Sequence, residues 1–84
     1  MRFSARVSIG LKPGVNDPQG NAVLNSLHAL GFASVGDVRV GKFLALELEA
    51  VDKAAAGAQV REMCDKLLAN PVIESYSVEV ARAG

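Results

Sequence analysis

The chain has little of what small catalytic, metal-binding or secreted domains require. Its 84 residues include one cysteine, one histidine and no tryptophan, and aromatic residues make up only 5%. A single cysteine excludes an intrachain disulfide framework and is typical of a reducing compartment. One cysteine and one histidine also fall short of the ligands that a zinc site needs. The core must therefore be built from aliphatic side chains.

The chain also lacks an excess of charge of either sign. Lys and Arg together number 9, as do Asp and Glu, so the formal net charge is zero. Nucleic-acid binders normally carry a basic excess, because contacts to phosphate supply much of their affinity. No apolar run approaches the roughly 18–20 residues that span a bilayer, and the chain does not start with a signal peptide's apolar stretch. We expect a cytoplasmic protein with no nucleic-acid or membrane partner.

Half of the residues are hydrophobic, which is a large share for so short a chain. One domain over residues 1–84 is expected, with residues 81–84 as a flexible tail. A domain of this size hides only about 60–65% of its unfolded surface. We therefore expect some apolar surface to be buried between subunits, in a homodimer or a dimer of dimers.

The first half of the chain changes its apolar period once. Alternation over residues 3–11 predicts a strand with one buried face. Pro13-Gly14 then forces a turn, and Asp17 can cap a helix over residues 18–30, which has apolar residues at helical spacing. Gly31 is typical of a C-terminal helix cap.

The alternation after this helix predicts a β-hairpin. Pairing Val40 with Leu44 and Val38 with Leu46 keeps both apolar rows on one face of the hairpin. That register predicts a loop of Gly41-Lys42-Phe43, or a bulge.

The last third predicts a helix followed by a strand. Asp52 opens the helix, and Asn70 can take a left-handed cap before Pro71 prevents continuation. The strand is expected over residues 72–80. The buried face of the helix is predicted to carry Ala56, Val60, Met63, Cys64 and Leu67, and its other face the ion pairs Glu62–Lys66 and Arg61–Asp65.

The predicted element order is βαββαβ. Its simplest packing is a two-layer α+β sandwich, in which a four-stranded antiparallel sheet carries two helices on one face, as in ferredoxin-like folds. The other face of the sheet then needs cover, which favours dimerisation through the sheet.

No group of residues assembles a catalytic, cofactor-binding or metal-binding site. His28 lies beside the apolar stripe of its helix and has no partner that would make it a base or ligand. Cys64 lies on an apolar helix face, which disfavours a thiolate. Glu47 and Glu49 fit an exposed sheet face or an intersubunit ion pair, and Tyr76 a core edge or an interface.

Four segments of the chain are distinctive, namely LKPGVNDPQG at residues 11–20, LHALGF at 27–32, DVRVGK at 37–42 and LLANPVIESY at 67–76. Together they resemble the PurS family, the small subunit of phosphoribosylformylglycinamidine synthase. The resemblance spans nearly the whole chain and is weakest over residues 52–59.

The resemblance implies a role in purine biosynthesis without a catalytic site in this chain. It implies a dimer that bridges a large ATP-dependent synthetase and a glutaminase and supports ammonia transfer between them. The assembled complex, and not this chain, is expected to use ATP and Mg²⁺. Exposed polar groups beside special backbone geometry give the candidate interface residues, which are Lys12, Asp17, Gln19, Arg39, Lys42 and Asn70. For Asp17 and Asn70 we rank the structural roles, as cap and helix stop, above the interface role.

A stand-alone regulatory domain that binds a small molecule is the alternative. Such domains share the βαββαβ order and often carry a Pro-Gly turn after the first strand, similar to Pro13-Gly14. An acylphosphatase-type enzyme would need an arginine in the loop that holds Lys12, and a metal chaperone would need a second cysteine beside Cys64.

Overall fold

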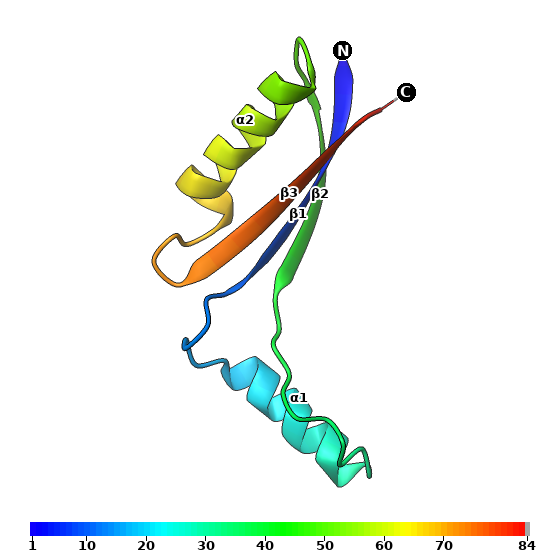
Figure 1. Cartoon of the computed structure of the whole chain (residues 1–84), viewed down its shortest axis with the longest axis vertical. Coiled ribbons are helices and arrows are strands. Elements are labelled where there is room, and N and C mark those ends of the chain that lie inside the picture. Colours follow the sequence, from blue (N-terminus) through cyan, green and yellow to red (C-terminus); the bar gives the residue numbers. More distant parts are fainter. Residues whose placement is uncertain (84) are drawn as a thin grey trace.

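Two differently packed parts make up the chain in the computed structural model, which describes residues 1–83 (Figure 1). One part is an antiparallel sheet with a helix on one face, and the other is a helix that projects beyond the end of the sheet. The molecule measures 50 × 29 × 14 Å and has a radius of gyration of 16.4 Å. A compact chain of this length would have a radius of about 12 Å.

The sheet contains three strands within the described residues. β1 (Arg2–Leu11) is central and pairs antiparallel with both β2 (Lys42–Glu49) and β3 (Glu74–Arg82). The register sets the apolar rows of the three strands side by side, with Val7 opposite Leu44 on one side and Val78 on the other. One face of the sheet is therefore aliphatic, as the alternation predicts.

The helix α2 (Lys53–Met63) lies over β1 and β3 on this aliphatic face. Asp52 caps it by accepting a hydrogen bond from Ala55 N–H at 2.8 Å, as predicted. The buried core between helix and sheet consists of Ala5, Val7, Ile9, Val60, Cys64 and Ala69. The aliphatic side chains of β2 remain only half-buried, since α2 is placed over the other two strands.

The projecting helix α1 (Pro18–Ala29) begins and ends where the sequence predicts. Asp17 is its N-cap. At its other end Gly31 has a φ of 98°, and Phe32 N–H donates to Leu27 O at 2.9 Å, which is the Schellman arrangement. Local capping signals therefore define this helix without support from the sheet.

The predicted hairpin is wrong. Residues 35–41 form neither a helix nor a strand and lead directly into β2, so the sheet of the described residues has three strands instead of four, and α1 does not lie on it (Figure 1). The physical reason lies in Asp17 and Arg39, which bind the segment to the loop after β1. Folding Val40 back onto Leu44 would break those bonds.

The second helix ends differently from the prediction. Residues Cys64–Leu68 form a π-helical turn, η1, closed by Ala69 N–H on Cys64 O at 3.0 Å. The wider turn rotates Leu67 to the surface, where it is 82% exposed, and gives its predicted core position to Leu68 and Ala69. Asn70 is not left-handed; its side chain accepts a hydrogen bond from Val72 N–H instead.

The ends of the chain correct one further expectation. Ala81 and Arg82 belong to β3, where they pair with Ser4 and Phe3, so they are not a flexible tail. Gly84, the last residue of that predicted tail, lies outside the described residues. Among residues 1–83, no helix is both long and apolar enough to cross a membrane.

Candidate functional site

The six candidate interface residues gather at one end of the sheet. β1 ends there and both outer strands begin there, so three connecting segments meet. We call this region the junction and define it as loop 12–17, segment 38–42 and turn 69–74. Five candidates lie in the junction, and Gln19 follows it in the first turn of α1.

Asp17 holds the junction to α1. It is 5% exposed, and its two carboxylate oxygens accept from Gly20 N–H at 2.9 Å and from Val40 N–H at 2.8 Å. The bond from Gly20, then the bond from Val40, lower the pKa of Asp17 below its usual value, and the Arg39 charge adds to them against the opposing effect of burial. One side chain thus caps the helix and fixes the segment that returns from it.

Arg39 fixes the same segment from the other direction. Its guanidinium donates to the carbonyl of Val15 at 2.9 Å and to the carbonyl of Lys12 at 3.1 Å. The planar fork of an arginine suits this contact with two carbonyls of one loop. Arg39 is therefore a brace between two junction segments, and its charge remains partly exposed to solvent.

The remaining candidates connect the turn that precedes β3. Lys12 Nζ donates to Pro71 O at 2.7 Å, while Lys42 Nζ lies 3.7 Å from a carboxylate oxygen of Glu74. The other oxygen of Glu74 accepts from Asn70 N–H at 2.7 Å. All of these polar groups bind within the chain, whereas Gln19 is exposed and lines a shallow hollow beside the junction.

Two glycines that were not among the candidate interface residues complete the junction. A Cβ on Gly20 would lie 2.1 Å from Val38 O, and a Cβ on Gly41 would lie 2.4 Å from Ile9 O. Both positions therefore bring two backbones closer than any side chain permits. The sequence signal that could have identified these two glycines is their position within the motifs at residues 11–20 and 37–42.

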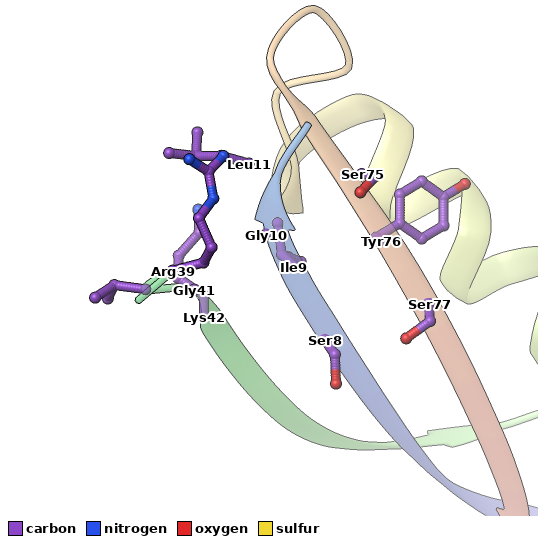
Figure 2. Close-up of a pocket in the computed structure, with 11 residues that line it drawn as sticks. Ser8, Ile9, Gly10, Leu11, Arg39, Gly41, Lys42, Ser75, Tyr76 and Ser77 are labelled. Atoms are coloured by element: carbon purple, nitrogen blue, oxygen red, sulfur yellow. The ribbon is translucent and has the colours of Figure 1, made fainter. Parts of the chain in front are cut away.

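An open pocket at the junction carries hydroxyls and two cations (Figure 2). Ser8, Ser75 and Ser77 lie on neighbouring strands along its floor, and Arg39 and Lys42 lie at its rim. Both cations already contact oxygens of the chain, as described above. The arrangement offers hydrogen bonds to a partner surface.

The other residues considered from the sequence have structural contacts. His28 Nε2 lies 2.7 Å from Val35 O, and Tyr76 donates to Asp65 at 3.0 Å, a bond that raises the pKa of Tyr76. Burial raises the pKa of the Cys64 thiol, which suits a core residue. Glu47 and Glu49 are exposed and lie 3.7 and 3.4 Å from Arg2.

Of the two predicted helix ion pairs, one forms. Lys66 Nζ lies 2.6 Å from Glu62. Asp65 accepts the hydrogen bond of Tyr76, and in the part of the chain that the structure describes it has no ion pair with Arg61.

Large apolar side chains are exposed in several places, two of which are relevant here. Leu30 and Phe32, at the far end of α1, are 73% and 56% exposed. Leu67 in η1 and Val72 in the junction turn are 82% and 78% exposed. Apolar surface on this scale in a small chain is typical of protein interfaces.

Comparison with known proteins identifies one family. The family model described as PurS, phosphoribosylformylglycinamidine (FGAM) synthase, matches residues 4–82. The synthase subunit PurS of Synechocystis is 47% identical over 78 residues, which cover 93% of this chain and 78% of that protein.

Solved structures agree with this assignment. Bacillus subtilis PurS superposes with a TM-score of 0.86 at 45% identity and covers 95% of this chain and 99% of that one. A chain of the PurLQS structure from Thermotoga maritima has a TM-score of 0.88 at 32% identity, with 96% and 99% covered.

Replacing Gly20 by alanine tests the close approach of α1 to the returning segment. In an ordinary helix this change stabilises by about 1 kcal/mol, but here the added carbon meets the Val38 carbonyl. We expect the free energy of unfolding to fall by about 1–3 kcal/mol in urea titrations. The matched control is Gly57→Ala in α2, where the new carbon meets only the flexible end of Arg61 at 3.3 Å. Equal behaviour of the two variants would contradict the role of Gly20.

Acidification tests the carboxylate of Asp17. Because its folded-state pKa lies below the ordinary value of 3.8, its contribution to stability is complete above that value and is lost as the pH falls through the folded pKa. We expect Asp17→Asn to destabilise the chain at neutral pH and to show a flatter loss of stability in acid than the original chain. Urea unfolding at a series of pH values measures both, and parallel curves would contradict the assignment.

Proposed function

This chain belongs to the PurS family of phosphoribosylformylglycinamidine synthase subunits, and we propose that it is the non-catalytic subunit that bridges the glutaminase and the ATP-dependent synthetase. In this role it acts as a homodimer in the cytoplasm and supports transfer of ammonia between the two enzymes. The synthase is a ligase of purine biosynthesis. Its PurLQS assembly in Thermotoga maritima contains a chain that is similar to this one.

One observation supports the bridging role most directly. The polar candidates of the junction hold its backbone in place, while Leu67 of η1 and Val72 of the junction turn are 82% and 78% exposed. Exposed apolar side chains in the same region as polar groups such as Gln19 and Lys42 have the composition of a protein interface. We propose that this turn and the junction contact the larger subunits.

The same contacts support a subunit without chemistry of its own. The three junction cations, Lys12, Arg39 and Lys42, contact backbone carbonyls and a carboxylate, and the single cysteine of the sequence is in the core. We propose that ATP and Mg²⁺ bind to the larger subunits of the assembled complex and that this chain binds neither.

Reconstitution tests the proposal. This chain is mixed with the large synthetase and the glutaminase of the same organism, and glutamine-dependent product is assayed with ATP and Mg²⁺. We expect product formation to require this chain. Full activity in its absence would contradict the proposal and would favour the regulatory-domain alternative, which a titration with small molecules would then examine.

The variant Leu67→Ser locates the contact in the same assay. Loss of one buried leucine from an interface weakens association by about ten-fold or more, so we expect a matching rise in the concentration needed for half-maximal activity. Val51→Ser is the matched control, since Val51 is 78% exposed but lies in the turn between β2 and α2, away from the junction. An equal effect of the two variants would contradict the assigned surface.

A further inference from the structure

The outer edge of β3 is open to pairing. Among residues 1–83, β3 is bonded on one side only, to β1, and its register with β1 runs without a break from Glu74 to Arg82 (Figure 1). Its sequence contains no proline. Bulges and prolines are two of the means by which proteins protect an edge strand from the addition of a further strand. The edge of β3 has neither.

This edge presents the backbone groups of alternate residues. At the two ends of the β1–β3 pair, Ala83 N–H donates to Arg2 O at 3.0 Å and Lys12 N–H donates to Ile73 O at 2.8 Å. Because hydrogen-bonded positions alternate along antiparallel strands, the odd-numbered residues of β3 direct their N–H and C=O groups at β1. The groups that point outward, without a partner among residues 1–83, belong to even-numbered residues, which include Tyr76, Val78 and Val80.

An open pocket of about 620 Å³ lies between this edge and α2. Val78 and Val80 line it from the sheet and are half-buried, and Ala54 and Gly57 line it from the helix. Glu79 also lines the pocket, but alternation along β3 places its carboxylate on the face away from α2. The small residues of α2 therefore leave space beside β3 for the side chains of a further strand.

Cations without a partner gather near this edge. Within residues 1–83, the lysines and arginines that have neither an ion pair nor a side-chain hydrogen bond are Arg6, Lys53, Arg61 and Arg82. Lys53 and Arg61 line the pocket, and Arg82 is the last residue of β3. The chain as a whole carries no net charge, so this edge is a local positive region that favours an acidic partner.

We propose that the outer edge of β3 is the docking site for an extended acidic segment of another protein. The segment adds a strand to the sheet, and its backbone exchanges hydrogen bonds with Tyr76, Val78 and Val80. Its carboxylates lie beside Lys53 and Arg61. This site is separate from the junction, so the proposal does not depend on the function proposed above.

The spacing of the two pocket cations defines the segment more closely. Lys53, Gly57 and Arg61 follow one another at intervals of four residues on one stripe of α2, so the two cations are about 12 Å apart along the helix. Residues i and i+4 of an extended chain are about 13 Å apart, and residue i+2 lies between them on the same side. The expected segment therefore has two acidic residues four positions apart, with a small residue midway that faces Gly57.

Two other occupants fit this edge less well. A second copy of β3 would bring Lys53 and Arg61 of one chain close to the same cations of the other, and these charges repel. A phosphate chain, as in a nucleic acid, would neutralise the cations. It would supply no donors to the outward C=O groups of Val78 and Val80, however, whereas a peptide backbone supplies both donors and acceptors.

A fluorescent peptide tests the proposal with the full chain. The probe is TETATET, which has the expected pattern; in TKTATKT lysines replace the glutamates, and in TETPTET a proline removes the central N–H that would bond to β3. We expect TETATET to bind in anisotropy titrations and to slow amide exchange at Val78 and Val80, and the two control peptides to do neither. Absence of saturable binding at millimolar TETATET would overturn the proposal, as would equal binding of the three peptides.

Charge reversal in the chain locates the site. We expect Arg61→Glu to raise the Kd of TETATET about ten-fold, because attraction is replaced by repulsion. The matched control is Arg6→Glu, which makes the same change of charge on β1, on the face away from α2, and should raise the Kd by no more than about two-fold. The double variant Lys53→Glu with Arg61→Glu is expected to prefer TKTATKT. Equal effects of the two single variants would overturn the proposal, as would tighter binding of inorganic polyphosphate than of TETATET.

Discussion

The arrangement of the whole chain depends on the two hydrogen bonds accepted by Asp17. One oxygen binds the first turn of α1 and the other binds Val40, so a single buried carboxylate decides that the chain leaves the helix beside it and continues straight into β2. Arg39 repeats the constraint from the loop side. Gly20 and Gly41 permit it, because any side chain at either position would meet a carbonyl. A charged acceptor of two backbone donors is among the stronger local ties available to a small domain.

Because the segment after α1 is held in line with β2, some apolar surfaces of the chain are buried and others remain uncovered. The core beneath α2 closes within one chain, but the leucine row of β2 and the apolar side of α1 lie on opposite sides of the junction in a molecule 50 Å long (Figure 1). Neither can reach the other, so the free energy of burying them is available only to an assembly. The stability of the chain therefore increases when a partner covers these surfaces, which suits a subunit that acts by binding other proteins. The exposed turn at Leu67 and Val72 remains available for a different contact.

Structural features that depend on residues close together in the sequence could be predicted from it. Alternation gave β1, and Asp17 and Gly31 gave the two ends of α1, because strand faces and helix caps depend on residues a few positions apart. The hairpin could not be predicted correctly, since Val38 and Val40 match the leucine row equally well within one chain or between two.

The ends of helices and strands, and the roles of the site residues, were harder to predict from the sequence. Nothing in the pattern from Ala56 to Leu67 marks the π-helical turn that exposes Leu67, because one extra residue in a turn is decided by packing at its end. The six candidate residues do meet at one end of the sheet. Their contacts with backbone carbonyls and amides, however, depend on a loop geometry that only the folded chain defines.

Amide hydrogen exchange of the purified chain tests the central claim most directly, namely that the carboxylate of Asp17 holds Val40 beside α1. Because Val40 N–H donates to Asp17, the account predicts that this amide exchanges orders of magnitude more slowly than in an unstructured peptide. Exchange of the Val40 amide at the rate of an unstructured peptide, while the amides of β1 stay protected, would contradict it.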